Sequence, residues 1–314
     1  MAGMHDDEIE VDEPLVRDLL ASLSPAYAGL PLRRFTPTGS TNALFRLGDD
    51  LLVRVPRQPG GTATIEKEQR WLPYVAPVLP VRVPQIVATG APAAGYPEKW
   101  SLVRFLQGET PTVPAPGRPP RHALARDLAQ VVTGLRSLEV PPAASADPAL
   151  RWYRGRPLAD LDDELRRLLA DCREMAGLGL DVDAVERAWD EAVALPAPEG
   201  DEPLWHHGDL VAENLLTRDG RLVAVLDFGC LSVGRPAVDL VVAWELLDPA
   251  ARGTFRASVG VDDVEWGLGR GWALALAIMA LPYYWHSMPE RCVHRLAMVR
   301  AVLDDVGHDG PSGP

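Results

Sequence analysis

Apolar residues in the first hundred positions occur in short runs separated by turn-forming residues, which is typical of a small β-sheet. The runs predict extended segments at residues 45–47, 51–55, 81–83, 85–88 and 100–106, after a first strand that ends near Phe35. Gly48-Asp49-Asp50 predicts a tight turn between the first two of these runs. One helix is expected from about residue 64 to residue 72, because Pro73 removes a backbone donor. This part of the chain therefore predicts a small mixed sheet with one helix.

The pattern becomes helical after residue 107. Residues 111–120 are rich in proline and glycine and predict a loop. From about His122 onward, apolar residues recur at three- and four-residue steps, as on one face of a helix. Further elements are predicted as helices at about residues 158–174, 183–194 and most of 237–306, and as a hairpin with an Asp-Gly turn at residues 215–226. The chain therefore predicts an α+β fold with an N-terminal lobe at residues 1–106 and a helical lobe at residues 107–314.

Composition narrows the class of protein. The chain has 314 residues, of which 47% are hydrophobic and 24% are charged, and this balance excludes a disordered protein. The net charge of −13 argues against a nucleic-acid partner. The acidic first ten residues do not form a signal peptide, and the most apolar run, residues 273–285, is shorter than the ~20 residues that cross a bilayer. Because the three cysteines form no CxxC pair, we expect a soluble, cytoplasmic protein without a membrane partner; the oligomeric state stays open.

Polar residues that hydrophobic packing does not explain stand on both sides of the predicted hairpin. His206-His207-Gly208-Asp209 and Asn214 precede it, and Asp227-Phe228-Gly229 follows it. Because a hairpin brings its ends together, we expect Asn214 and Asp227 to lie close to one another, with Asp209 just upstream. Oxygen-bearing side chains of this kind suit Mg²⁺. An Asp, an Asn five residues later and a following Asp-Phe-Gly are also the layout of protein kinases, in which the first Asp accepts a hydroxyl proton and the other two residues hold Mg²⁺.

Gly208 departs from protein kinases, which have an arginine between the His and the Asp. With His-Gly-Asp, four residues, Asn and a later Asp-Phe-Gly, the chain resembles the aminoglycoside phosphotransferase family over about residues 35–305. The resemblance continues to Asp239, although Arg235 stands where the family usually has an aspartate. It implies a protein-kinase-like bilobal fold, with a small nucleotide-binding lobe and a larger helical lobe that contains the catalytic hairpin and the acceptor groove. It also implies that His207 supports the catalytic loop and that Asp239 braces it.

The resemblance further implies a nucleotide site in the N-terminal lobe. A basic residue on the third strand of the family contacts the α- and β-phosphates and pairs with a helix glutamate. Arg54 matches this residue, with Glu68 as its partner or Glu66 as the alternative. Arginine keeps the charge of the usual lysine and adds bidentate reach, whereas the competing interpretation is an exposed strand arginine. The remaining nucleotide-binding candidates are the loop residues Gly39, Ser40 and Thr41 and the inter-lobe hinge of Arg104, Phe105 and Leu106.

These residues predict an O-phosphotransferase that uses ATP or GTP to phosphorylate a hydroxyl of a small molecule. Asp209 would orient the hydroxyl and take its proton, while Asn214 and Asp227 would hold Mg²⁺. The family receives protonated amines in an acidic groove, so the expected acceptor is a cationic, aminoglycoside-type antibiotic, whose phosphorylation would cause resistance. The candidate acceptor-binding carboxylates are Glu213, Glu245 and Asp248. A macrolide or a cellular metabolite is the alternative acceptor, and a non-catalytic, nucleotide-binding pseudokinase is a third interpretation.

Overall fold

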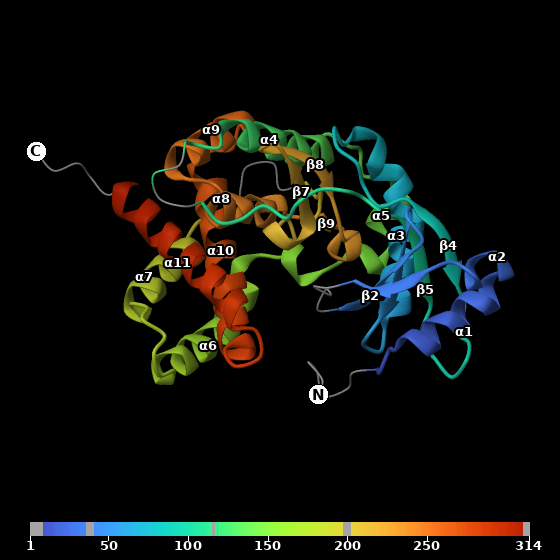
Figure 1. Cartoon of the computed structure of the whole chain (residues 1–314). Coiled ribbons are helices and arrows are strands. Elements are labelled where there is room, and N and C mark those ends of the chain that lie inside the picture. Colours follow the sequence, from blue (N-terminus) through green and yellow to red (C-terminus); the bar gives the residue numbers. More distant parts are fainter. Residues whose placement is uncertain (1–8, 36–40, 115–116, 118, 197–201, 310–314) are drawn as a thin grey trace, which may run out of the picture. The chain divides into compact units, whose positions relative to one another are not determined.

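The structure is a computed structural model that describes residues 9–35, 41–114, 117, 119–196 and 202–309. The chain divides into two compact units. Unit 1 comprises residues 1–77, 82–107 and 224–229, and unit 2 comprises residues 78–81, 108–223 and 230–314. Unit 1 contains a small antiparallel sheet and unit 2 is mainly helical (Figure 1). This arrangement confirms the predicted α+β class with a sheet-containing N-terminal lobe and a helical C-terminal lobe.

The sheet of unit 1 has five antiparallel strands in the order β1-β2-β3-β5-β4. They are β1 (Leu32–Arg34), β2 (Asn42–Leu47), β3 (Leu51–Pro56), β4 (Ile86–Gly90) and β5 (Trp100–Arg104). Buried and half-buried residues alternate along β2, as the two-residue period of a strand requires. Gly48, whose φ is +56°, makes the turn that pairs β2 with β3. The structure confirms these predicted strands, whereas residues 81–83 form only an isolated bridge from Arg82 to Ala224.

Two helices precede the sheet, so the expectation of a single helix in this region is wrong. They are α1 (Glu13–Leu23) and the short α2 (Pro25–Ala28). The Asp12 carboxylate caps α1 by accepting from the Leu15 N–H at 2.9 Å. The buried side chains Val16, Leu19 and Leu20 belong to the same hydrophobic core as Phe45 and Trp100 of the sheet. The helix is thus stabilised by packing on unit 1 in addition to its cap.

Helix α3 (Gly61–Val75) carries Glu68 and passes through Pro73, where the sequence predicts an end. Pro73 lies in the last turn, so it removes only a late intrahelical hydrogen bond. Leu72 and Val75 on either side of it are buried, and this packing offsets the loss. The turn η1 (Ala76–Val78) follows directly.

Unit 2 is built mainly from helices. The α-helices are α4 (His122–Arg136), α5 (Pro142–Ser145), α6 (Asp162–Glu174), α7 (Val182–Val193), α8 (Val242–Leu246), α9 (Pro249–Val259), α10 (Asp263–Tyr284) and α11 (Pro289–Asp309). The 3₁₀ turns are η2 (Pro148–Leu150), η3 (Tyr153–Gly155), η4 (Leu158–Leu161), η5 (Ala212–Asn214) and η7 (Pro236–Val241), with η6 (Phe228–Cys230) at a boundary between the units. The helices predicted from residue 122, at residues 158–174 and at residues 183–194 are confirmed, the second as η4 followed by α6.

Four short strands frame the candidate site. β7 (Leu215–Arg218) and β8 (Arg221–Val225) form the predicted hairpin, with Asp219 and Gly220 at φ values of +52° and +75°. β6 (Leu204–His206) pairs antiparallel with β9 (Ser232–Gly234), which the sequence does not predict. Because β6 ends at His206, this small sheet fixes the point at which the loop from His207 to Asn214 begins.

Helix α10 is the apolar core helix of unit 2. It is 22 residues long, which exceeds the apolar run identified from the sequence, and it continues past Pro282 in its last turn. By length and composition alone it would be able to cross a membrane, but 61% of its apolar window is buried inside the protein. Its partners include α6, α7, η7 and α11. This burial is the environment of a core helix.

Candidate active site

The loop that follows β6 is held by one buried carboxylate. Asp239 of η7 accepts hydrogen bonds from the N–H groups of His207 at 2.7 Å and Gly208 at 2.8 Å. Gly208 has a φ of +78°, and a Cβ atom there would lie 2.6 Å from the carbonyl oxygen of Cys230. Only glycine therefore fits between the His and the Asp. The His207 Nδ1 accepts from the Asp209 N–H at 3.2 Å, so the predicted bracing by Asp239 and support by His207 are both present as contacts.

Asp209 and Asn214 meet in unit 2. The Asn214 amide donates from Nδ2 to the main-chain oxygen of Asp209 and to its Oδ2, each at 2.9 Å. The turn η5 between them closes this five-residue loop, with Asn214 N–H donating to the Val211 oxygen at 2.9 Å. Within the described residues, Oδ1 of Asn214 has no hydrogen-bond partner. The amide thus orients the Asp209 carboxylate and keeps one oxygen available as a ligand.

Arg154, which the sequence analysis does not single out, lies against the same carboxylate. Its Nη1 donates to the Gly208 oxygen at 2.8 Å and also to Oδ1 of Asp209. Burial alone would raise the pKa of Asp209, but the charge and hydrogen bond of Arg154 outweigh it, so this pKa lies below its usual value. The two residues are 55 positions apart in the chain, and no spacing rule connects them. The sequence therefore offered no signal for this pair.

Unit 1 contributes a second charged cluster. Arg54 of β3 donates to both oxygens of Glu68 in α3, from Nη1 to Oε2 at 2.8 Å and from Nη2 to Oε1 at 3.2 Å. Both residues are buried, so Arg54 is not an exposed strand arginine. Glu66, the alternative partner, pairs instead with Lys99 at 2.5 Å. The predicted Arg54–Glu68 pairing is confirmed.

Asp227 lies beside this pair. Its Oδ1 is 3.7 Å from Nη2 of Arg54 and accepts from the Gly229 N–H at 3.2 Å. Burial would lower the pKa of Arg54, but the charges of Glu68 and Asp227 raise it above its ordinary value, so the guanidinium remains protonated. Asp227 has a φ of +52°, a conformation that non-glycine residues rarely adopt and that is often found at functional sites.

The donor atoms fit a magnesium ion. The Asp227 side chain is 38% exposed, and its Oδ2 has no partner among the residues that the structure describes. This oxygen and the Oδ1 of Asn214 are each of the type that Mg²⁺ prefers as a ligand. In the described ranges, no group of three His, Cys, Asp or Glu side chains lies close enough together to hold a metal ion.

The structure describes only some of the remaining nucleotide-binding candidates. Gly39 and Ser40 lie outside the described residues, and Thr41 is described only at the start of β2, where its Oγ1 accepts from Asn42 Nδ2 at 3.1 Å. In the predicted hinge, the Arg104 N–H donates to the Gln85 oxygen at 2.9 Å and the Phe105 N–H donates to the Asp50 oxygen at 2.8 Å. Of these three hinge residues, only Leu106 has an N–H without a partner in the described part of the chain. It is the hinge donor that remains for a base edge.

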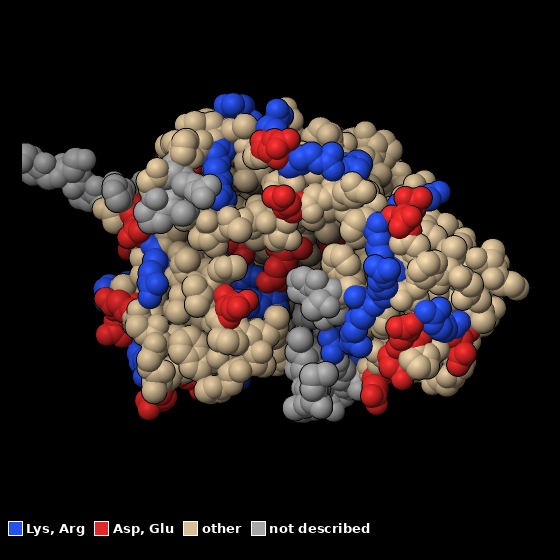
Figure 2. Space-filling view, in the orientation of Figure 1, with Lys and Arg blue, Asp and Glu red and all other residues tan. Residues whose placement is uncertain are grey.

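The predicted acceptor-binding carboxylates all have protein partners. Glu245 is buried, where Oε1 accepts from Arg295 Nη1 at 2.6 Å and Oε2 accepts from the Ala212 N–H at 2.7 Å. Glu213 is more exposed and accepts from Arg291 Nη2 at 2.6 Å. Asp248 caps α9 through Ala251 and also accepts from the Arg121 N–H at 3.0 Å. Acidic and basic side chains are both exposed on the face of the molecule that Figure 2 shows.

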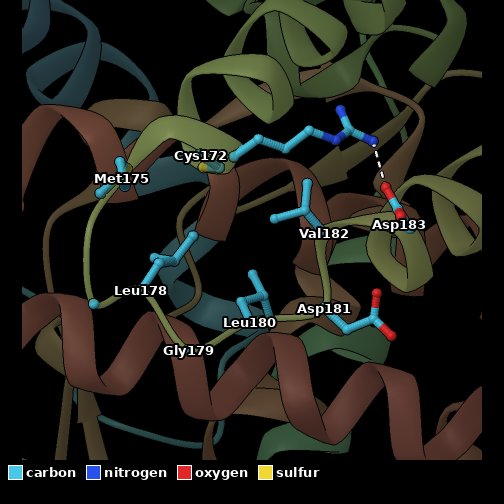
Figure 3. A pocket seen from close by; sticks show the side chains of 10 residues that line it. Cys172, Met175, Leu178, Gly179, Leu180, Asp181, Val182 and Asp183 are labelled. Atoms are coloured by element: carbon cyan, nitrogen blue, oxygen red, sulfur yellow. Dashed lines mark hydrogen bonds and ion pairs between the residues drawn. The ribbon is translucent and has the colours of Figure 1, made fainter.

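A surface pocket of about 560 Å³ lies at the turn between α6 and α7 (Figure 3). Cys172, Met175, Leu178 and Val182 supply apolar walls, and an Arg173–Asp183 ion pair of 2.9 Å crosses one side. Burial, with a smaller effect of Asp171, raises the pKa of Cys172 to about 11, so its thiol stays protonated. None of the predicted site residues lines this pocket.

Comparisons with known proteins identify one matching family and solved structures with a similar fold. A family model described as the phosphotransferase enzyme family matches residues 33–273. Among solved structures, wild-type aminoglycoside 2'-phosphotransferase-IIIa in complex with GDP is 18% identical, with a TM-score of 0.65, over 94% of this chain and 100% of that one. The macrolide 2'-phosphotransferase MphH from Brachybacterium faecium is 23% identical, with a TM-score of 0.59, over 92% and 97% of the two chains. The streptomycin–ATP ternary complex of APH(2'')-IIa is 18% identical, with a TM-score of 0.60, over 93% and 99%. No curated protein sequence matches the chain.

Proposed function

This chain belongs to the phosphotransferase enzyme family, a family that acts on hydroxyl groups, and from this membership we propose that it transfers the γ-phosphoryl group of ATP or GTP to a small molecule. The observation that carries the proposal is the contact between Asn214 and Asp209. It joins the residue that the motif assigns to the acceptor hydroxyl with the residue that it assigns to the metal. Solved structures of similar proteins in complex with GDP, ADP or ATP support a nucleotide as the donor.

In this proposal, Asp209 receives the acceptor hydroxyl. Its carboxylate accepts the hydrogen bond of the hydroxyl and directs the oxygen toward the γ-phosphorus. As the new oxygen–phosphorus bond forms and the bond to the β-phosphate oxygen breaks, the hydroxyl proton passes to Asp209. Little covalent chemistry is required of the protein, so most of the rate enhancement comes from this orientation.

Arg54 steadies the phosphates of the donor. Its guanidinium is fixed by the two bonds to Glu68, so it pays little conformational entropy when it binds the phosphates. Asn214 and Asp227 would hold Mg²⁺, which when bound neutralises the charge of the triphosphate. The Leu106 N–H would bind the base edge.

The proposal also concerns the chemical class of the acceptor. The sequence predicts a cationic antibiotic, but Glu213, Glu245 and Asp209 each have an arginine partner that reduces the attraction for an ammonium group. These pairs favour the alternative, a neutral or weakly basic acceptor such as a macrolide. Solved structures with a similar fold include both aminoglycoside and macrolide phosphotransferases.

The test is phosphorylation of a panel of aminoglycosides, macrolides and peptide antibiotics by the purified protein with Mg²⁺ and either ATP or GTP. We expect at least one acceptor to gain the mass of a phosphoryl group, with equal release of nucleoside diphosphate. A cationic acceptor would bind more weakly as the salt concentration rises, whereas a neutral one would not. Nucleotide binding without transfer to any acceptor would contradict the proposal and favour a pseudokinase.

A further inference from the structure

The side chain of Arg154 is held in place by contacts outside the loop that carries Asp209. Its Nε donates to the Tyr153 hydroxyl at 3.0 Å, and the Tyr153 ring packs against Trp272 of α10 with 6.3 Å between the ring centroids. Trp272 is buried in the core of unit 2. The guanidinium is therefore anchored through its neighbour to the apolar core helix of the unit.

The backbone next to Arg154 is docked on the small sheet that precedes the loop. A Cβ atom on Gly155 would lie 2.9 Å from Cε1 of His206, and one on Gly234 would lie 2.6 Å from the Gly155 oxygen. The Gly155 oxygen also accepts from the Arg235 N–H at 3.0 Å. Two glycines thus permit a close approach that any side chain would prevent. The approach places η3 against β6 and β9, next to the residues that begin the catalytic loop.

From this position, Arg154 fixes both the backbone and the side chain of the loop. Nη1 donates to the Gly208 oxygen and to Oδ1 of Asp209, while Asn214 donates to Oδ2 of the same carboxylate. Each oxygen of the Asp209 carboxylate therefore has its own donor, and the two hydrogen bonds together fix the plane of the carboxylate. Each carboxylate oxygen can accept more than one hydrogen bond, so capacity remains for an acceptor hydroxyl.

The environment makes this ion pair stronger than an ordinary surface pair. The side chains of Arg154 and Asp209 are only 17% and 28% exposed, so water screens the pair weakly. A charge-assisted hydrogen bond in such a place is short and directional. Orientation is also the main contribution that the protein makes to phosphoryl transfer.

We propose that Arg154 is a positioning residue, which acts on phosphoryl transfer by holding the Asp209 carboxylate in the orientation that receives the acceptor hydroxyl. The proposal rests on the proposed function, because it assumes that Asp209 binds that hydroxyl. The role differs from that of Arg54, which would contact the donor. Arg154 acts through Asp209 and needs no contact with either substrate.

The first test does not depend on activity. In nuclear magnetic resonance spectra of the full chain, the side-chain amide protons of Asn214 report whether Asp209 stays in place. Arg154→Met is expected to shift these signals and to accelerate their exchange with water, and Arg154→Lys is expected to do so less. Arg156→Ala is the matched control, because Arg156 is exposed and stands two residues away on the same segment. Unchanged Asn214 signals in Arg154→Met would overturn the proposal even if the protein transferred phosphate to no acceptor.

The second test is a double-mutant cycle with Asp209→Asn, measured on the acceptor that the wild-type protein phosphorylates. Arg154→Met is expected to lower kcat by about 10²-fold with little change in the KM of the nucleotide, because a misplaced reacting group costs on that order. In the Asp209→Asn background, the same substitution should have almost no further effect. Partial recovery of Arg154→Ala by added guanidinium at non-denaturing concentration would support the role. An equal loss in both backgrounds would show that Arg154 acts only on folding and would overturn it.

Discussion

The guanidinium of Arg54 donates to both oxygens of Glu68, at 2.8 Å and 3.2 Å. The family resemblance implies a lysine as the usual residue at this position. A lysine offers one ammonium group, whereas the planar fork of arginine matches a carboxylate with two parallel bonds. The chain has only two lysines, and neither replaces Arg54. Lys67 is buried in α3, and Lys99 pairs with Glu66. Arg54 is therefore the cation that we propose for binding the donor phosphates.

Substitution of Arg54 tests this assignment. Arg54→Ala should lower nucleotide affinity at least about tenfold, and it should lower the free energy of unfolding by about 3 kcal/mol, because Glu68 is left buried and unpaired. Arg54→Lys should lose less of both, since it keeps the charge. Isothermal titration of ATP and GTP, together with thermal unfolding, measures the two effects.

The control for Arg54 is the exposed Glu66–Lys99 pair at the same helix. Glu66→Ala should change the free energy of unfolding by less than about 1 kcal/mol, because exposed ion pairs contribute little to stability. It should leave nucleotide affinity unchanged. Full nucleotide affinity in Arg54→Ala would show that Arg54 has a structural role only.

Removal of Asp227 should affect the metal-dependent part of nucleotide binding. Asp227→Ala deletes an exposed carboxylate oxygen that has no partner among the described residues, so the triphosphate would lose a ligand for its counter-ion. Calorimetric titration of ATP with and without Mg²⁺ should show that Mg²⁺ strengthens binding to the wild-type protein and has little effect on the variant. A variant that retains the full Mg²⁺ effect would exclude Asp227 as a ligand.

Gly208 and Gly220 form a matched pair of glycines at positive φ. Gly220→Ala should cost roughly 1–2 kcal/mol of unfolding free energy, because its surroundings are open and only the backbone conformation is unfavourable. Gly208→Ala should cost more and should also reduce phosphoryl transfer, since its Cβ would collide with the Cys230 oxygen and displace Asp209. Thermal unfolding and kcat of both variants provide the comparison. Equal costs with full activity would contradict the close packing of the loop.

Substitutions of Glu245 and Glu213 test whether these carboxylates stabilise the fold or bind the acceptor. Glu245→Gln should destabilise the fold by about 3 kcal/mol, because Arg295 remains buried without its partner charge, and the KM of the acceptor should stay unchanged. Glu213→Gln should change stability by less than about 1 kcal/mol, because Glu213 is largely exposed. A rise in acceptor KM for Glu245→Gln without loss of stability would restore the acidic-groove interpretation.

Local patterns in the sequence predicted much of the fold and of the site. The alternation in β2, the Gly48 turn and the spacing of apolar residues in α4 act over a few residues, and the structure contains each of these elements. The loop from Asp209 to Asn214 is equally local. The Arg54–Glu68 pair was expected from the family resemblance, and the structure contains it between a strand and the following helix.

Features that depend on contacts distant in sequence could not be predicted in this way. Arg154 reaches Asp209 only because Gly155 and Gly234 pack closely, and no spacing reveals such an approach. The pairing of β6 with β9 is likewise a tertiary contact between three-residue strands. For Glu245, the sequence shows an acidic residue on a helix but not the Arg295 that neutralises it. Its acceptor-binding role was inferred from its charge and from the acidic groove of the family, whereas in the structure Glu245 is buried and paired with Arg295.

The central claim is that the carboxylate of Asp209 receives the acceptor hydroxyl, and the most direct measurement compares Asp209→Ala with the wild-type protein in phosphoryl transfer and in nucleotide binding. The variant removes the carboxylate and leaves Arg54, Glu68 and Asp227 in place. We predict that phosphorylation of the acceptor falls by at least about 10²-fold, as expected for loss of a positioned proton acceptor, while the Kd of the Mg²⁺–nucleotide complex stays within about twofold. Transfer at the wild-type rate by the purified, folded variant would contradict the account.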